Sequence, residues 1–328
     1  MKHLFRKKLY QKKYLLIGLL IIIIFVSGCI GQTKISPAKC GDGICNASKG
    51  ETKENCPDDC LKPPVNVSGL LGIGVFGLGA RASDRVADLG VEWTRRPVRW
   101  SQVEPTKGNF RWTEVDAEIA RNPQLNRIIT FSFDATWAKS CSDPPPTSCM
   151  PKDEQDLRNF VNAFVSRYAD DVDYWQIMNE PYGAILGGNK FWDGTMDEFV
   201  EVTRIASEEI RKADPDAKIL LAGIASAQTQ EQFENVFYQG NIEKVMKGAS
   251  DYFDIVDIHL YANTEDVPKK LSVLKDVMAR TGNSGKPVFS TENAVDFKPA
   301  PTNEQQAQDI PKRLSLTYAN GVILVTYF

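Results

Sequence analysis

The chain has 328 residues, of which 42% are hydrophobic and 25% charged, an ordinary globular composition with room for one large domain and an appendage. Its formal net charge is −3, so no basic excess points to a nucleic-acid partner. Only two histidines are present, which disfavours histidine-based metal sites and Ser-His-Asp triads. No metal and no cofactor is predicted.

Residues 1–29 have the pattern of a secretion signal. Basic side chains precede an apolar run at positions 15–26, an order typical of a signal rather than of a folded element. The run ends in Val-Ser-Gly-Cys29, which resembles a lipobox with Cys29 as the lipidated residue. An uncleaved anchor helix beginning near Tyr14 is the alternative. Both interpretations predict a chain tethered to the membrane, with its remainder on the extracellular face.

Residues 30–68 are predicted to form a cysteine-rich segment followed by a proline-rich linker. Seven cysteines are present, and setting Cys29 aside leaves an even number, as expected in an oxidising compartment. Four of them fall in this segment: Cys40, Cys45, Cys56 and Cys60. Two disulfides of unspecified pairing are predicted. A structural zinc site is the alternative, although the spacing is not the usual paired C-x-x-C.

Residues 69–328 alternate strand-like apolar runs with amphipathic segments. The predicted strands are Leu71–Phe76, Val91–Pro97, Arg127–Phe133, Val172–Asn179, Lys218–Ala222, Ile255–Tyr261, Pro287–Thr291 and Val322–Tyr327. The predicted helices are Ala82–Leu89, Glu114–Arg121, Glu154–Tyr168, Met196–Lys212, Gln230–Lys247, Lys269–Arg280 and Glu304–Tyr318. This alternation predicts β-α units and a parallel sheet.

Eight such units predict an α/β fold of the (β/α)8 TIM-barrel type, which typically takes about 250 residues. A doubly wound sheet is the alternative. It would place a glycine-rich loop where the first strand turns into a helix, whereas Gly72, Gly74 and Gly77 lie within the strand itself. The chain stops at Phe328, inside the eighth predicted strand, so the expected barrel lacks its last helix.

Polar side chains stand at the carboxyl ends of the predicted strands, where barrels of this type carry their active sites. They are Arg95 and Arg99, Asp134 and Trp137, Asn179 and Glu180, His259 and Tyr261, and Glu292 and Asn293. Glu180 and Glu292 come from strands expected to face each other across the barrel mouth. Paired carboxylates across a cleft suit cleavage of a glycosidic bond, because one donates a proton while the other attacks carbon or activates water.

Three motifs resemble clan A of the glycoside hydrolases. Asn179-Glu180-Pro181 follows the fourth predicted strand, and Ser290-Thr291-Glu292-Asn293 ends the seventh. After the second strand, Trp100 to Gly108 matches "W-x-x-x-E-P-x-x-G". The resemblance covers nearly all of residues 69–328 and is strongest to the xylosidase-type and the cellulase- or mannanase-type branches. It implies a retaining (β/α)8 hydrolase acting on a β-linked oligo- or polysaccharide.

The same resemblance implies roles for individual residues. Glu180 would be the general acid/base and Glu292 the nucleophile. Asn179 would bind the sugar 2-hydroxyl, and Arg95 would hold the Glu292 carboxylate ionised.

His259 and Tyr261 fit the residues of the clan's sixth strand, with Tyr261 hydrogen-bonded to the nucleophile. Three aromatic residues in loops after strands are candidates for stacking on sugar rings, with plain packing as the alternative: Trp137, Tyr182 and Trp192. In the loop after the third strand, Cys141 and Cys149 are predicted to form a disulfide that restricts the cleft on that side.

Two other functions use the same residues. A carbohydrate-binding barrel without catalysis is disfavoured because both carboxylates and their supporting residues are present. A transglycosylase would employ the same pair and differs only in the acceptor.

Overall fold

The computed structural model describes residues 71–74, 86, 89–182, 191–225, 241–261, 263–294 and 302–327. All of them belong to one compact unit, Leu61–Phe328. The predicted signal with Cys29 and the four clustered cysteines lie outside the described residues. Within the described part of the chain, none of the helices combines the length and the hydropathy needed to cross a membrane.

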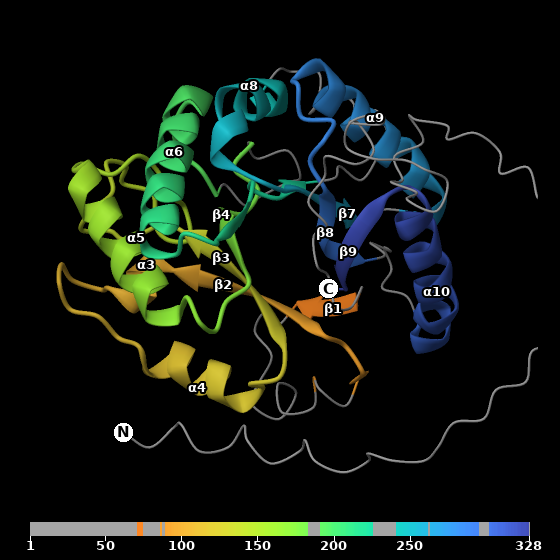
Figure 1. The fold of residues 1–328 in the computed structure, drawn as a ribbon, viewed down its shortest axis with the longest axis horizontal. Helices are drawn as coiled ribbons and strands as arrows, with labels where there is room; N and C mark the ends of the chain where they lie inside the picture. The colour runs from red at the N-terminus through yellow and green to blue at the C-terminus, as the bar shows by residue number, and fades with distance from the viewer. Residues whose placement is uncertain are drawn as a thin grey trace, which may run out of the picture. The chain divides into compact units, whose positions relative to one another are not determined.

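Parallel strands form a single curled sheet (Figure 1). They are β1 Leu71–Gly74, β2 Trp93–Arg99, β3 Asn126–Ser132, β4 Tyr174–Ile177, β5 Lys218–Leu220, β6 Ile224–Ala225, β7 Val256–Tyr261, β8 Val288–Ala294 and β9 Val322–Tyr327. Their order is β5-β4-β3-β2-β1-β9-β8-β7-β6. Each of the eight predicted strands is present, and the fifth is divided into β5 and β6.

The two edge strands of this order, β5 and β6, are joined by only three residues, 221–223. Strand β5 pairs with β4, and β6 pairs with β7. Between them, the Leu221 N–H donates to the Ile255 carbonyl at 2.9 Å, and isolated bridges join Leu220 to Ile255 and Asn179 to Gly223. The fifth strand therefore links both ends of the sheet, an arrangement consistent with the predicted (β/α)8 barrel.

Helices cover the outer face of the sheet (Figure 1). They are α3 Trp100–Val103, α4 Thr113–Arg121, α5 Glu154–Tyr168, α6 Met196–Ala213, α8 Asn241–Gly248, α9 Val267–Arg280 and α10 Asn303–Ala319, with 3-10 turns at Ser250–Tyr252 and Thr264–Asp266. The short α3 and the two 3-10 turns were not predicted. The predicted helix Ala82–Leu89 lies almost entirely outside the described residues, and Gln230–Lys247 is described only from Asn241.

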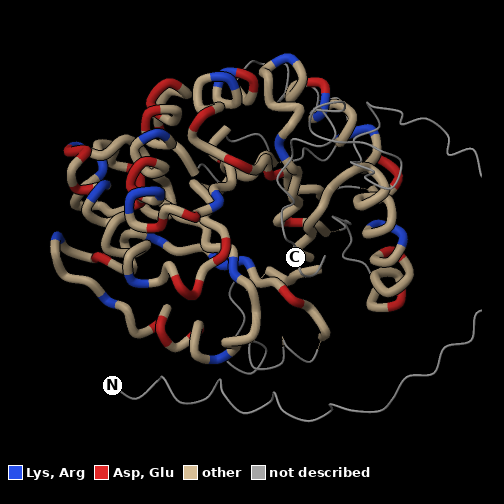
Figure 2. Tube along the Cα trace, in the orientation of Figure 1, with Lys and Arg blue, Asp and Glu red and all other residues tan. Residues whose placement is uncertain are grey.

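Local sequence explains where the long helices begin. The Asp153 side chain accepts from the Gln155 N–H and caps α5, and Thr195 forms a capping box with Glu198 at the start of α6. Acidic and basic residues are interspersed along these outer helices (Figure 2). Arg158 of α5 reaches α6, where it lies 3.1 Å from a Glu208 oxygen. Such half-exposed ion pairs add little to the free energy of unfolding, although this one joins α5 to α6.

Two apolar layers lie on opposite faces of the sheet. The larger packs the outer face against the helices, and its aromatic centre includes Phe131, Phe160 and Trp175. The smaller takes one buried residue from each of six strands and Ile255, which directly precedes β7: Trp93, Ile128, Tyr174, Leu220, Ile255, Phe289 and Leu324. Because side chains alternate along a strand, the next inward positions belong to Arg95, Thr130, Gln176 and Asp257. The barrel interior thus changes from apolar to polar toward the carboxyl ends.

The segment from Trp100 to Gly108 is held by one buried carboxylate. Glu104 accepts from Trp100 Nε1 at 2.7 Å and from the Gly108 N–H at 2.6 Å. Gly108 has a φ of 78°, a conformation that favours glycine. Trp137 Nε1 donates to the Glu104 carbonyl at 2.8 Å. The motif therefore shapes the loop after β2.

We expect Glu104→Ala to destabilise the protein by about 2 kcal/mol, because the fully buried Trp100 N–H loses its acceptor. The measurement is the free energy of unfolding in urea. Glu92→Ala, at an exposed position, is the control and should stay within about 0.5 kcal/mol of the parent. Equal effects in the two variants would contradict this account of the motif.

Candidate active site

Glu180 and Glu292, far apart in the chain, meet at the carboxyl ends of the strands. Glu180 follows β4, and Glu292 lies within β8. One carboxylate oxygen of each and a nitrogen of His259 all lie within 4.8 Å of one another. The structure therefore brings together the two carboxylates that the sequence predicted as a pair.

The chain leaves β4 through an unusual backbone. Met178 has a φ of 70° and Glu180 a φ of 41°, so two non-glycine residues occupy the left-handed region. Such residues cost roughly 1–3 kcal/mol each and persist only where the surroundings enforce them. Between them, Asn179 forms a bridge with Gly223 of the fifth strand. This turn lets the adjacent Asn179 and Glu180 both contact residues of the site.

Arg95 connects three groups of the site. Its Nη1 donates to Glu292 Oε1 at 2.6 Å, its Nη2 to Asn179 Oδ1 at 2.7 Å and its Nε to Gln176 Oε1 at 2.9 Å. The residue is 2% exposed. A buried guanidinium is tolerated only when its charge and its N–H groups are satisfied, and the Glu292 carboxylate provides the charge.

Glu292 is held ionised by donors on both oxygens. Arg95 occupies Oε1, and the Tyr261 hydroxyl donates to Oε2. Burial by itself would raise the pKa of Glu292, but the charges of His259 and Arg95, with these hydrogen bonds, hold that pKa below its usual value. Burial, and next the charge of Glu292, raise the pKa of Tyr261, so its phenol remains a donor.

His259 lies among three carboxylates and is fully buried. Its Nδ1 is 2.6 Å from Glu180 Oε1 and 3.5 Å from Glu292 Oε2, and its Nε2 is 3.2 Å from Asp257 Oδ2. Burial alone would lower the pKa of His259. The charges of Glu292 and Glu180 and the hydrogen bonds with Asp257 and Glu180 outweigh burial and raise the pKa to about 10. The imidazole is therefore a cation at neutral pH.

Two residues that connect this network, Gln176 and Asp257, were not predicted from the sequence. Gln176 accepts from Arg95 and from Thr130 Oγ1, and its Nε2 donates to Asp257 Oδ2 at 2.5 Å. Asp257 in turn accepts from the Thr291 N–H at 2.8 Å and from Thr291 Oγ1 at 2.5 Å. These contacts join the Arg95 side of the site to the His259 side. The signal in the sequence that could have identified Gln176 is a polar residue at an inward position of an otherwise apolar strand.

Glu180, His259 and Glu292 are also the described residues that could hold a metal ion between them. Their donor atoms are already engaged, because His259 is paired with Glu180 while Glu292 is bonded by Arg95 and Tyr261. The guanidinium of Arg95 and a protonated His259 would repel a second cation. The arrangement suits proton chemistry better than metal binding.

The three aromatic residues predicted to stack on sugar rings differ in their burial. Trp137 is half-buried and packs edge-on against Trp100. Tyr182 and Trp192 are buried in the outer core, where both pack against Phe199. Plain packing therefore explains Tyr182 and Trp192, the alternative that the sequence left open.

The loop after β3 is closed by the predicted disulfide between Cys141 and Cys149. The Ser148 N–H donates to the Phe191 carbonyl at 2.8 Å, and the Asp193 N–H donates to the Ser148 carbonyl at the same distance. The disulfide-bonded loop is thereby attached to the segment that precedes α6.

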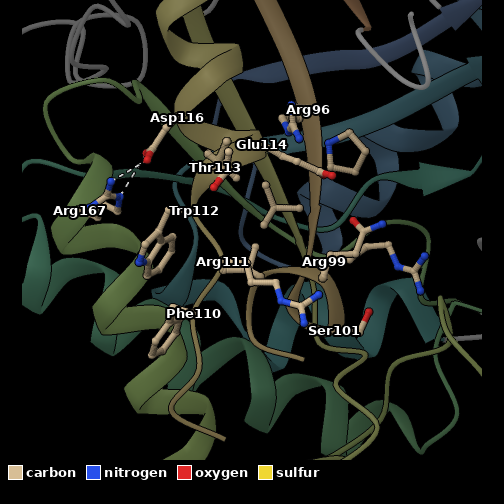
Figure 3. A pocket seen from close by; sticks show the side chains of 15 residues that line it. Arg96, Arg99, Ser101, Phe110, Arg111, Trp112, Thr113, Glu114, Asp116 and Arg167 are labelled. Atoms are coloured by element: carbon tan, nitrogen blue, oxygen red, sulfur yellow. Dashed lines mark hydrogen bonds and ion pairs between the residues drawn. The ribbon is translucent and has the colours of Figure 1, made fainter. Parts of the chain in front are cut away.

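A separate pocket of about 850 Å³ lies beside β2, α3 and the start of α4 (Figure 3). Its wall includes the stacked rings of Phe110 and Trp112 and the ion pair of Arg167 with Asp116. Neither Glu180 nor Glu292 lines it. The carboxylate pair, and not this pocket, therefore defines the candidate active site.

Fold and site together have the features of a clan A glycoside hydrolase. A family model described as cellulase (glycosyl hydrolase family 5) matches residues 79–325. The chain belongs to this family, which confirms the resemblance noted in the sequence.

Individual relatives share low sequence identity with the chain and match only part of it. A thermostable celloxylanase from Thermoclostridium stercorarium is 26% identical over 136 residues, which cover 35% of each chain. Endo-1,4-beta-xylanase A from Phanerodontia chrysosporium is 22% identical over 196 residues, covering 56% of this chain and 45% of the xylanase. The chain thus spans between about a third and a half of the length of these curated relatives.

Solved structures support the same fold. A family 39 glycoside hydrolase from Bacteroides cellulosilyticus superposes with a TM-score of 0.60 at 17% identity, covering 78% of this chain and 55% of that one. An endo-1,4-beta-D-mannanase from Thermotoga petrophila gives 0.55 at 14% identity, covering 79% and 87%. At these identities the similarity concerns the fold.

The raised pKa of His259 predicts a pH-dependent stability. Between pH 6.5 and about 10 the folded protein keeps a proton on His259 that the unfolded chain releases. The free energy of unfolding should therefore fall as pH rises through this window, by up to about 1.4 kcal/mol per pH unit, and the full contribution should be present below it. Urea unfolding at intervals across the window measures the slope. The unfolding free energy of His259→Gln should lack this decrease with pH. Identical slopes in parent and variant would show that His259 does not cause it.

Proposed function

We propose that this protein is a retaining glycoside hydrolase that cleaves O-glycosidic bonds in a β-linked oligo- or polysaccharide. The observation that carries the proposal is the approach of Glu180 and Glu292 oxygens to within 4.8 Å. Retaining enzymes hold their two carboxyl groups about 5–5.5 Å apart, whereas inverting enzymes need about 6.5–9.5 Å to admit a water. The short separation favours a double displacement.

In the first step, Glu292 attacks the anomeric carbon while the proton that Glu180 shares with His259 passes from Glu180 to the departing glycosidic oxygen. The bond from carbon to that oxygen breaks as the bond from carbon to the Glu292 oxygen forms. Arg95 and Tyr261 support this step because they keep Glu292 ionised and fix both of its oxygens. Asn179 uses its carbonyl oxygen for Arg95, which leaves its NH2 group to donate to the sugar 2-hydroxyl.

In the second step, Glu180 acts as a base and takes a proton from water, which attacks the anomeric carbon and releases Glu292. His259 supports Glu180 in both steps. Its Nδ1 lies 2.6 Å from Glu180 Oε1, so the ring orients the carboxyl and shares a proton with it. Asp257 holds the other ring nitrogen.

The two alternatives remain distinguishable by chemistry. A carbohydrate-binding barrel has no use for a buried, ionised carboxylate beside a second carboxyl, so the contacts of Glu292 disfavour it. A transglycosylase would use the same residues but transfer the glycosyl group to a sugar hydroxyl instead of water. Analysis of the products separates the two reactions.

Substituting the carboxylates should separate their roles. We expect Glu180→Gln to lower kcat by about 10²- to 10⁴-fold on a polysaccharide. The loss of kcat/KM should be much smaller on an aryl glycoside with an activated phenol, because the phenol leaves in the first step without a proton. Turnover on that substrate should still be slow, because the second step needs Glu180 as a base. Glu292→Gln should abolish the reaction on both substrates. Release of reducing sugar from xylan, mannan, galactan and β-glucan measures the first activity, and release of the phenol measures the second.

Glu92→Gln is the matched control, since it makes the same chemical change at an exposed position. It should retain parent activity. Nuclear magnetic resonance of the first-formed product should show the β-anomer. Unchanged activity in Glu292→Gln, or an inverted product, would overturn the mechanism.

The proposal also places the enzyme on the extracellular face of the membrane, held by lipid on Cys29. The order of basic residues, apolar run and Cys29 supports this placement. The disulfide between Cys141 and Cys149 agrees with it, because such bonds persist in oxidising compartments.

Cys29→Ser tests the anchor. We expect the parent protein to incorporate labelled palmitate and to sediment with membranes, and the variant to lose the label and appear in the soluble fraction. A variant that loses no membrane association would instead support the uncleaved anchor helix. The disulfide prediction for the four clustered cysteines is checked in the same preparations by counting free thiols.

A further inference from the structure

Gly223 lies where the fifth strand is divided, between β5 and β6. A Cβ built on it would lie 2.1 Å from His259 Nε2, 2.5 Å from Cε1 and 2.9 Å from Cδ2. Cβ contacts below 3.0 Å are essentially never observed. The φ of Gly223 lies outside the left-handed region, so the backbone conformation does not require glycine. Glycine is needed here for space, because the imidazole ring lies against its α-carbon.

The strand cannot move aside to make that space. Gly223 is bridged to Asn179, and the next two residues, Ile224 and Ala225, pair with Ile258 and His259. The backbone of Gly223 is therefore fixed from the β4 side and from the β7 side. An added methyl group has to displace the ring instead.

The ring has little freedom to move without losing its partners. His259 is fully buried and bonds Glu180 through Nδ1, while its Nε2 faces Asp257 and lies 3.4 Å from Thr291 Oγ1. Restoring a 3.0 Å contact requires a displacement of 0.9 Å, the difference between 3.0 and 2.1 Å. That displacement is large beside the 2.6 Å separation of His259 from Glu180.

We infer that Gly223 is a positioning residue for the acid/base: its missing side chain seats His259 so that the imidazole can orient Glu180. The inference rests on the proposed function and deepens it. The absence of a side chain at Gly223 thus contributes to the site, because a side chain there would occupy the place of the His259 ring.

Gly223→Ala should lower kcat on polysaccharide by roughly 10²-fold, the loss typical of misplacing a catalytic group by about 1 Å. KM on polysaccharide should change little, and kcat/KM on an activated aryl glycoside should be largely kept, because the first step on that substrate needs no proton from Glu180. Gly285→Ala is the matched control. A Cβ there meets nothing within 4 Å, so the control should behave as the parent. Equal losses of kcat/KM on both substrates would overturn the inference.

A double-variant cycle tests whether Gly223 acts through His259. In the His259→Ala background the added methyl group fits the vacated space, so Gly223→Ala should cause no further loss. Additive losses would show that the methyl group distorts the strand, and would overturn the inference. If Gly223→Ala alone fails to fold, the double variant should recover folding. Failure of both to fold would also overturn it.

A second readout does not depend on catalysis. The chain has two histidines, so in a His3→Gln background the only imidazole signal in magnetic resonance is that of His259. The charged groups that face it are Glu180 after β4, Asp257 on β7 and Glu292 on β8. Gly223→Ala should shift this signal and move its titration to lower pH, because the ring loses part of its contact with these carboxylates.

An unchanged His259 signal and titration in Gly223→Ala would overturn the inference, whatever the enzyme's activity. A different pair of results would count against the proposed function and not against this inference. If the signal shifts as expected but the parent protein hydrolyses no glycan, the role of Gly223 in seating His259 stands while the glycosidase proposal fails.

Discussion

The structure depends on the mutual neutralisation of charges inside the barrel. Arg95, Asp257, His259 and Glu292 are each less than a tenth exposed, and none could stay ionised alone in such a place. They are arranged so that each cation contacts an anion, with Arg95 on Glu292 and His259 between Glu292 and Asp257. Gln176, uncharged, completes the connection from Asp257 back to Arg95. The Glu292 carboxylate stays ionised because the charges of His259 and Arg95 lie beside it.

The fold provides the conditions for this balance. Seven apolar side chains fill the interior directly below, so water does not reach the charges from that side. The alternation of side chains along parallel strands then sets Arg95, Gln176 and Asp257 at one level and the paired carboxylates above it. The positive φ of Met178 and Glu180 is the strained part of the arrangement, and it stands where the chain must present two adjacent polar side chains to the site.

Much of this was predictable, for identifiable reasons. Strand and helix patterns are local, so β9 and α5 were predicted with their observed bounds, and polar residues at strand ends pointed to Glu180 and Glu292. The division of the fifth strand was not predictable, because it depends on two neighbouring strands that are distant in sequence. Gln176 resembled any polar residue in a strand, and only its contacts reveal its role. Tyr182 and Trp192 could equally stack or pack until their burial was known.

The division of the fifth strand also has a consequence for how heat would affect the site. Two strands of three and two residues form the seam at which the sheet closes, so the paired stretch on each side is short. Local opening concentrates where pairing is short. At this seam, opening would separate Gly223 from His259 and Asn179 before the outer core is disturbed. Heat would then disrupt the site at a temperature below that of global unfolding. The site would re-form quickly on cooling, because most of the barrel would have stayed folded.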